Sequence, residues 1–106
     1  MTVQRFQKIP IVVEAIQWTG DNEAEIVAWV GDDASLGMFY ALDAEDRANC
    51  DDMDATATVF DRLHSTWVLV FTGQWVIKGV QGEFYPCADD VFKVTYAEVG
   101  GIDTSG

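Results

Sequence analysis

The chain has 106 residues and a formal net charge of -12, because eighteen acidic residues face six basic ones. This length predicts one domain, and the 49 % hydrophobic content excludes a disordered chain in spite of the charge. An acidic surface repels phosphate groups, so the composition excludes direct binding to nucleic acids and to anionic membranes. The longest apolar run, Trp67 to Phe71, is far shorter than the roughly 20 residues that span a bilayer.

The first thirty residues predict a strand followed by a helix. Residues 1–8 are expected to form a loose lead-in. Residues 9–18 are rich in β-branched side chains and largely apolar on both faces, which favours a central strand. Residues 22–30 are expected to form the main helix, with Asn22 and Glu25 at the spacing of a capping box. The glycine that follows is a typical C-terminal stop.

The middle of the chain is its most acidic part. Two strands are predicted, at 37–42 and 55–60, and residues 43–54 between them show no apolar period. This segment is therefore expected to be a long exposed loop. Its acidic residues are candidates for binding a basic partner, and they are Asp43, Glu45, Asp46, Asp51, Asp52 and Asp54.

A nearly neutral aromatic stretch, Trp67 to Tyr96, follows the acidic middle. Three strands are predicted in it, at 67–72, 75–80 and 83–85. Tight turns at Gly73-Gln74 and Gln81-Gly82 are expected to join these strands into a meander, because glycine adopts positive φ angles without a steric penalty.

The end of the chain completes the predicted fold. Pro86 is expected to end the third strand of the meander, and a short helical turn is expected at about 88–92. A last strand is predicted at 94–99, before a flexible tail at 100–106. The whole chain is thus predicted to be a single small α+β domain, in which a mixed, mainly antiparallel sheet carries the main helix and this helical turn.

The aromatic stretch supplies the candidate residues for binding a ligand or a partner. Its large rings could form a wall for a planar ligand, or could pack one face of the sheet against the main helix. Glu83 could have a raised pKa among these rings, as functional carboxylates often do, or could pair across strands with Lys78. The candidate binding residues are Trp67, Trp75, Lys78, Glu83, Phe84 and Tyr85.

The chain has four tryptophans, which is more than so small a core needs. We therefore expect at least one of them to line a pocket or a subunit interface. An exposed sheet edge and these surplus rings together favour a homodimer.

Few residues are available for catalysis or metal binding. A cysteine nucleophile needs a base, and the single histidine, His64, would have to fold back onto Cys50 or Cys87. No serine lies in a Gly-x-Ser-x-Gly elbow. One histidine and two distant cysteines cannot close a zinc site, and the acidic loop lacks the EF-hand order, which leaves at most a weak cation site. We expect no catalytic residue, no metal site and no cofactor, and the two reduced thiols indicate a cytosolic protein.

Two blocks of sequence resemble a family of small tailed-bacteriophage proteins of uncharacterised function. The first block is IVVEAIQWTG, which spans residues 11–20 and follows Ile9-Pro10. The second is WVIKGVQGEFYPC, residues 75–87, followed by Asp90-Val-Phe and Thr95-Tyr96. The resemblance implies an accessory phage protein that acts in the cytoplasm of the infected bacterium, and it brings no catalytic residues with it. At Gln74 the family commonly has Asp, and the middle of this chain is longer and more acidic than the family pattern.

Three functions remain open at this stage, and none of them is enzymatic. The first is binding of a host factor or defence signal, in which the acidic chain would attract a basic surface of its partner. The second is mimicry of nucleic acid, in which the acidic residues occupy the basic DNA-binding site of a host protein. The third is the binding and sequestration of a small, nucleotide-like molecule.

Overall fold

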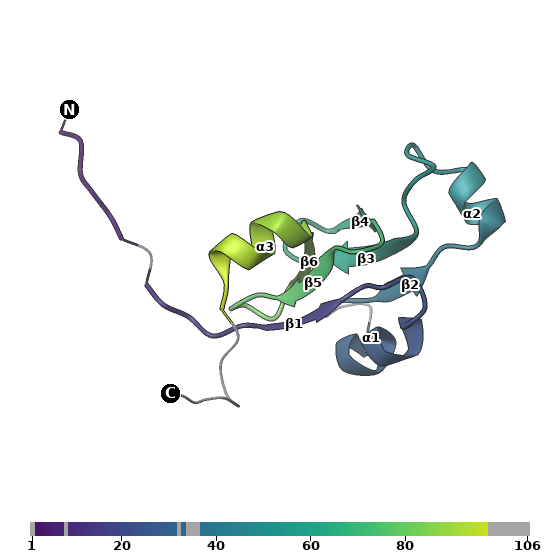
Figure 1. Ribbon diagram of the computed structural model, residues 1–106, viewed down its shortest axis with the longest axis horizontal. Coiled ribbons are helices and arrows are strands. Elements are labelled where there is room, and N and C mark those ends of the chain that lie inside the picture. The colour runs from purple at the N-terminus through teal and green to yellow at the C-terminus, as the bar shows by residue number, and fades with distance from the viewer. Residues whose placement is uncertain (1, 8, 32, 34–36, 98–106) are drawn as a thin grey trace.

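The computed structural model describes residues 2–7, 9–31, 33 and 37–97 (Figure 1). It is a small α+β domain with two antiparallel three-stranded sheets, in the orders β1-β5-β6 and β2-β3-β4. The strands are β1 (Glu14–Gln17), β2 (Phe39–Ala41), β3 (Ala57–Asp61), β4 (Thr66–Val70), β5 (Trp75–Lys78) and β6 (Phe84–Cys87). The helices are α1 (Glu23–Val30), α2 (Ala44–Ala48) and α3 (Asp89–Thr95). The α+β class is confirmed, but the single predicted sheet is in fact two sheets.

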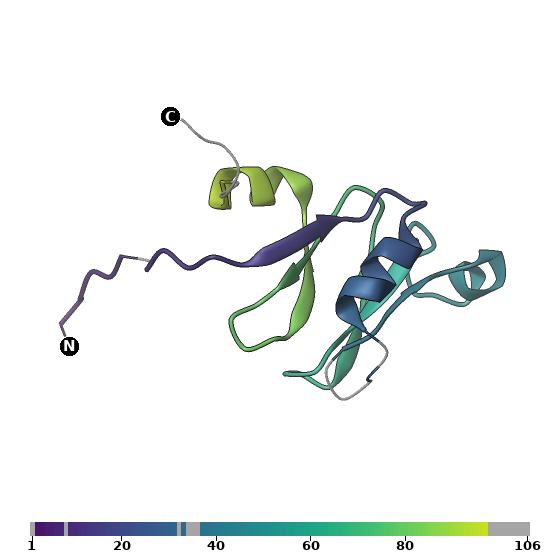
Figure 2. The same cartoon turned by 90° about the horizontal axis from the view of Figure 1, so that it is seen from below.

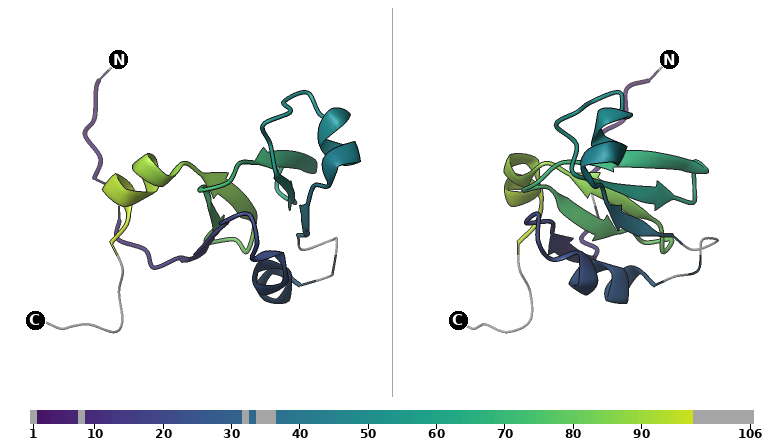
Figure 3. Two further views of the ribbon diagram at one scale, coloured as in Figure 1. Left: turned by 45° about the vertical axis from the view of Figure 1, so that its right-hand side comes forward. Right: turned by 90° about the vertical axis from the view of Figure 1, so that its right-hand side faces the viewer.

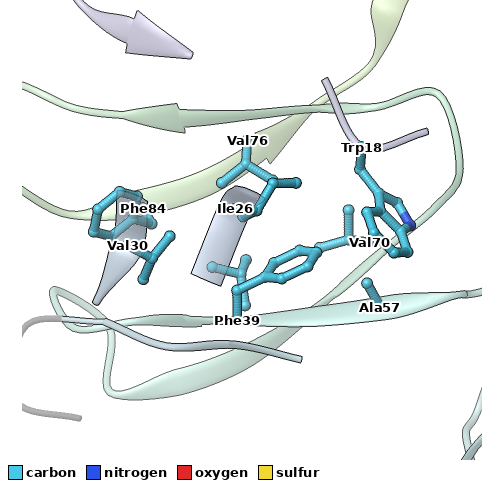
Figure 4. Packing of buried hydrophobic residues seen from close by; sticks show 9 residues of the cluster. Trp18, Ile26, Val30, Phe39, Ala57, Val70, Val76 and Phe84 are labelled. Carbon is cyan, nitrogen blue, oxygen red and sulfur yellow. The ribbon is translucent and has the colours of Figure 1, made fainter. Parts of the chain in front are cut away.

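The core lies where the inner faces of the two sheets meet α1, and Figure 4 shows its packing. Trp18 is 1 % exposed and meets Phe39 edge to face, with ring centroids 5.2 Å apart. Its indole N–H donates to Thr56 Oγ1 at 2.8 Å, so the polar edge of the ring is satisfied. Burying a large apolar side chain contributes about 1.5–3 kcal/mol. The buried members of the cluster are Trp18, Ile26, Val30, Phe39, Ala57, Val59, Val70, Val76 and Phe84.

The predicted hairpin through Gly73-Gln74 is wrong, because β4 and β5 belong to different sheets. β4 pairs with β3, and β5 pairs with β1. The turn between β4 and β5 is held by Trp18, whose carbonyl accepts from Gly73 N–H at 2.7 Å and whose N–H donates to Gln74 O at 2.8 Å. It therefore passes the chain from one sheet to the other across the core (Figure 3).

The predicted central strand at 9–18 is also wrong in extent and position. Only Glu14–Gln17 form β1, and this strand lies at the edge of its sheet. Glu14 pairs with Lys78, after which the partner strand β5 ends and the chain turns toward β6. Residues 9–13 consequently run beyond the end of β5 and belong to no strand, although their sequence favours one.

The acidic segment 43–54 is not only a loop, because it contains the helix α2. Asp43 and Asp46 form a capping box, in which Asp46 N–H donates to Asp43 Oδ1 at 2.8 Å. None of the residues of α2 is buried, so the helix needs no apolar face and leaves no apolar period in the sequence. By contrast, the Asn22 side chain does not cap α1, and it binds Gln17 O at 2.8 Å instead.

The C-terminal prediction is confirmed for the helical turn and wrong for the strand after it. Residues 89–95 form the helix α3, which covers most of the helical turn expected at about 88–92 and continues through Thr95. The described residues of the strand expected at 94–99 therefore form the end of this helix or belong to no strand. Phe92 stacks on Trp75 of β5 with centroids 4.2 Å apart and packs against Tyr96, the residue just after the helix, at 5.1 Å. Tertiary packing thus outweighs the strand preference of Val94 and Thr95. The predicted tail at 100–106 lies outside the described residues.

Pro86 does not end the third strand of the predicted meander. It lies within β6, where it pairs with Val76. β6 is an edge strand of its sheet, and a proline is tolerated there because no second neighbour needs its missing N–H.

Candidate functional site

The structure does not gather the predicted aromatic residues into one wall. Phe84 is 2 % exposed and belongs to the core, where it meets Trp29 edge to face. Trp75 and Tyr85 alternate with core residues along β5 and β6, and therefore lie on the outer face of their sheet. Trp67 lies on the other sheet. The six candidates thus divide among the core, two sheet faces and a turn.

Trp67 belongs to a group of apolar side chains on the outer face of the β2-β3-β4 sheet. It stacks with Tyr40 at a centroid distance of 5.6 Å and an interplanar angle of 30°, and it packs against Phe60 at 5.4 Å. Trp67 is 47 % exposed and Tyr40 is 45 % exposed, so this face is open to solvent. The strand registers place five residues on this outer aromatic face, namely Tyr40, Thr58, Phe60, Trp67 and Leu69.

The acidic segment lies at one end of the outer aromatic face. It leaves β2 after Ala41 and enters β3 at Ala57, at the end where Tyr40 pairs with Thr58 (Figure 1). All six of its carboxylates belong to exposed residues. Some of them also organise the local backbone, since Asp52 Oδ1 accepts from Asp54 N–H at 3.0 Å. Within residues 2–7, 9–31, 33 and 37–97, no three or more His, Cys, Asp or Glu residues form a group that could hold a metal ion.

The other sheet has its outer face against α3. Trp75 stacks on Phe92 with centroids 4.2 Å apart, and its indole N–H donates to Asp89 Oδ1 at 2.9 Å. This hydrogen bond, followed by one from Lys93, lowers the pKa of the Asp89 carboxyl below its ordinary value. Burial, and then the hydrogen bond with Tyr96, raises the pKa of Tyr85 to about 12. These contacts hold α3 against the outer face of the β1-β5-β6 sheet.

A groove of about 730 Å³ lies beside this covered face. One wall is the extended segment 9–13, and the other wall is α3 with the residues just after it. Ala15 and Trp75 also line the groove. The lining is largely apolar, and Lys93 is the single charged side chain among the described residues that form it. Sequence reasoning missed this groove because it predicted strands at 9–18 and 94–99. In the structure, segment 9–13 belongs to no strand and residues 89–95 form the helix α3.

A smaller pocket of about 280 Å³ contains two cations, Arg62 and Lys78. Arg62 Nη2 donates to Gln81 O, while Arg62 Nε is buried without a hydrogen-bond partner. Lys78 Nζ lies 6.0 Å from the centre of the Phe84 ring. The predicted pairing of Lys78 with Glu83 is wrong, since the strand register pairs Lys78 with Phe84.

Glu83 lies in the turn between β5 and β6, and not in the predicted strand. Its Oε1 accepts a hydrogen bond of 3.1 Å from the Gln81 N–H. The carboxylate therefore stabilises the conformation of its own turn. The same turn is closed by backbone hydrogen bonds, from Gly82 N–H to Gly79 O at 3.0 Å and from Gly79 N–H to Glu83 O at 2.7 Å.

His64 and Cys87 each have other partners. His64 Nδ1 lies 2.7 Å from Asp61 Oδ2, and Cys87 Sγ donates to Ala88 O at 3.6 Å. Burial, and then the nearby charge of Asp90, raises the pKa of the Cys87 thiol. A raised pKa leaves less of the nucleophilic thiolate at neutral pH.

No family model, no curated protein and no solved structure matches this chain. None of the helices in the described residues is long and apolar enough to cross a lipid bilayer. The geometry is therefore the main guide to function. Sequence reasoning identified Trp67 but missed its ring partners Tyr40 and Phe60, because they lie on two other strands and only the pairing of β2, β3 and β4 brings the three rings together.

Proposed function

We propose that this chain is a non-enzymatic binding protein whose outer aromatic face docks onto a basic protein partner. One observation carries the proposal: the half-exposed stack of Trp67 on Tyr40 lies on an open sheet face beside six exposed carboxylates. Large rings that keep their positions through packing are frequent anchors of protein interfaces. Exposed acidic groups at the rim speed the encounter with a positively charged surface.

The identity of the rings and the fold around them support this interpretation. Phe60 and Trp67 are cross-strand partners, and β3 and β4 hold their backbones in register. Such preordered rings lose little conformational entropy on binding, so most of the energy from burying them is available for affinity. The net charge of -12 disfavours acidic partners and favours basic ones.

We place this activity in a tailed bacteriophage, as an accessory protein that binds a host protein in the cytoplasm of the infected bacterium. The two sequence blocks that resemble the phage family support this placement, because both contribute to the β1-β5-β6 sheet and so mark one structural unit. The outer aromatic face lies on the other sheet, which comes from the longer, more acidic middle of the chain. The partner is therefore expected to be specific to this chain.

Quantitative affinity capture from a bacterial lysate tests the proposal. A host protein captured by the wild-type chain should be lost with Trp67→Ser and with Tyr40→Ser, and retained with Val80→Ser. Val80 is a matched control because it is exposed but lies in the β5–β6 turn. Capture that is equal for Trp67→Ser and the control would overturn the proposal. Capture that does not weaken in high salt would overturn its electrostatic part.

Mimicry of nucleic acid uses the same acidic segment in a different way. If the captured protein binds DNA, the mimicry hypothesis predicts that the wild-type chain competes with DNA for this protein. The competition should then be lost when Asp51, Asp52 and Asp54 are all replaced by Asn, and should survive Trp67→Ser. These results would show that the acidic segment, and not the outer aromatic face, is the binding site.

A small-ligand function is favoured by a different observation, the pair of cations in the smaller pocket. Arg62 and Lys78 line one pocket of a strongly acidic protein, and the buried Arg62 Nε has no hydrogen-bond partner. A small anionic ligand, such as the phosphate of a nucleotide, fits this chemistry. Titration with inorganic phosphate, followed by NMR, should shift the Gly82 amide in the wild type and not in Lys78→Gln. The control is Lys93→Gln, and an unchanged spectrum of the wild type would exclude this alternative.

A further inference from the structure

The N-terminal arm, residues 2–7 and 9–13, carries several large apolar side chains, and its residues 2–7 extend away from the domain (Figure 1, Figure 2). Val3 is 88 % exposed and Phe6 is 87 % exposed, and Ile9, Ile11 and Val12 are exposed as well. A row of large apolar residues on an extended segment costs free energy in water, and such surfaces usually mark an interaction site. The arm therefore needs a surface to cover it.

The arm differs in charge from the rest of the chain. Residues 1–13 contain Arg5 and Lys8 and no acidic residue, which gives this segment a formal charge of +2. Residues 14–106 contain the other four basic residues and all eighteen acidic ones, which gives a charge of -14. A second copy of this chain is thus a strongly anionic surface for a cationic arm.

The groove between segment 9–13 and α3 offers an apolar surface of suitable character. It has a volume of about 730 Å³, and its lining combines aliphatic residues with the rings of Trp75, Phe92 and Tyr96.

The arm is not built to reverse onto the groove of its own chain. Residues 2–13 contain no glycine, and Pro10 restricts the residue before it to extended conformations. Segment 9–13 already forms a wall of the groove, and residues 2–7 continue outward from it. The six residues from Thr2 to Gln7 can span about 20 Å when extended, which is enough to cross to a neighbouring molecule.

We propose that two copies of this chain form a dimer by exchanging their N-terminal arms, with Val3 and Phe6 of each copy in the groove of the other. The exchange is isologous, since the same segment and the same groove meet twice around a two-fold axis. Segment 9–13 is the part of the arm that joins the domain, and it is also a wall of the groove. An exchange of arms therefore brings the two grooves side by side. The dimer presents two outer aromatic faces, so a partner with two sites would bind it with avidity.

The test measures the mass of the full chain in solution by light scattering coupled to gel filtration. We expect the wild type to have twice the 11.7 kDa mass of one chain, and Phe6→Asp to have the mass of one chain. Phe6→Leu, which stays apolar, and Val80→Asp, which puts the same charge elsewhere on the surface, should both remain dimers. Thr95→Trp, which fills the groove from α3, should be a monomer.

Each outcome decides for or against the exchange. Circular dichroism of Phe6→Asp should match that of the wild type, because the side chain is exposed and contributes nothing to the core. A wild type with the mass of one chain would overturn the proposal and leave the groove to another occupant. A dimer that survives Phe6→Asp would also overturn it, since the two copies would then meet through another surface.

Discussion

Trp75 on β5 and Phe92 on α3 lie nearly parallel, with ring planes 9° apart and centroids 4.2 Å apart. This stack, together with the hydrogen bond from Trp75 to Asp89, attaches the C-terminal helix to the outer face of the β1-β5-β6 sheet. It also positions one wall of the groove that we propose as the site of arm exchange. The attachment of α3 is therefore a requirement of the dimer that we propose.

Phe92→Ala should loosen this attachment. We expect the free energy of unfolding to fall by about 2 kcal/mol, since part of a ring stack and its buried area are lost. The near-ultraviolet circular dichroism of the tryptophans should weaken as well. Val94→Ala is the matched control, because Val94 is on the same helix and is almost fully exposed. Equal losses of stability in the two variants would contradict the role of the stack.

Asp61→Asn should make the stability less dependent on pH. Burial raises the pKa of Asp61, but hydrogen bonds from His64 and from Leu63 N–H outweigh it, so the pKa lies below the ordinary 3.8. A lowered pKa stabilises the fold above the unfolded-state pKa, and this contribution is lost as the pH falls through the folded-state pKa. We expect Asp61→Asn to cost about 1–2 kcal/mol at neutral pH and less in acid.

Urea unfolding at neutral pH and in acid measures this difference. Asp54→Asn is the control, since Asp54 is exposed in the acidic segment. If the destabilisation by Asp61→Asn were the same at both pH values, the ionised carboxylate would not be the stabilising species.

Gly37→Ala should destabilise the protein more than Gly73→Ala. Both glycines have positive φ angles, of 149° and 99°, so both substitutions strain the backbone. A Cβ atom on Gly37 would lie 2.7 Å from Cδ2 of the buried Phe84, whereas one on Gly73 would meet nothing within 4 Å. We expect about 1 kcal/mol for Gly73→Ala and at least about 2 kcal/mol for Gly37→Ala, by chemical denaturation. Equal costs would show that the Phe84 ring moves aside freely.

Cys87 should react slowly with iodoacetamide in the folded protein. Burial, and then the charge of Asp90, raises its pKa and reduces the thiolate fraction. Asp90→Asn removes the charge and should therefore increase the alkylation rate of Cys87, as measured by mass spectrometry of the peptide that contains it. Asp89→Asn is unsuitable as a control because it disturbs Trp75, so Asp54→Asn serves instead. A rate that Asp90→Asn leaves unchanged would contradict the electrostatic effect.

The sequence alone predicted several elements well. Short runs rich in apolar and β-branched residues located β3, β4 and β5, and the acidic residues before an apolar stretch located α1. Gly31 ends that helix with a φ angle of 91°, as a glycine at this position was expected to do. The candidate Trp67 was found because large aromatic residues are conspicuous in a small chain. At least one tryptophan was expected to line a pocket or a subunit interface, and Trp75 lines the groove beside α3.

The sequence could not reveal which strands pair or what surrounds each ring. A period of two residues tells which side chains share a face, but β4 carries the same alternation whether it pairs with β3 or with β5. The choice depends on the core between the two sheets, where Trp18 binds both sides of the turn after β4. The same packing buries Phe84, leaves Trp67 in solvent and turns residues 89–95 into a helix. Composition and local pattern thus determined the class, the acidity and most of the strands, whereas contacts between distant residues decided the partners of the strands and the surfaces available for binding.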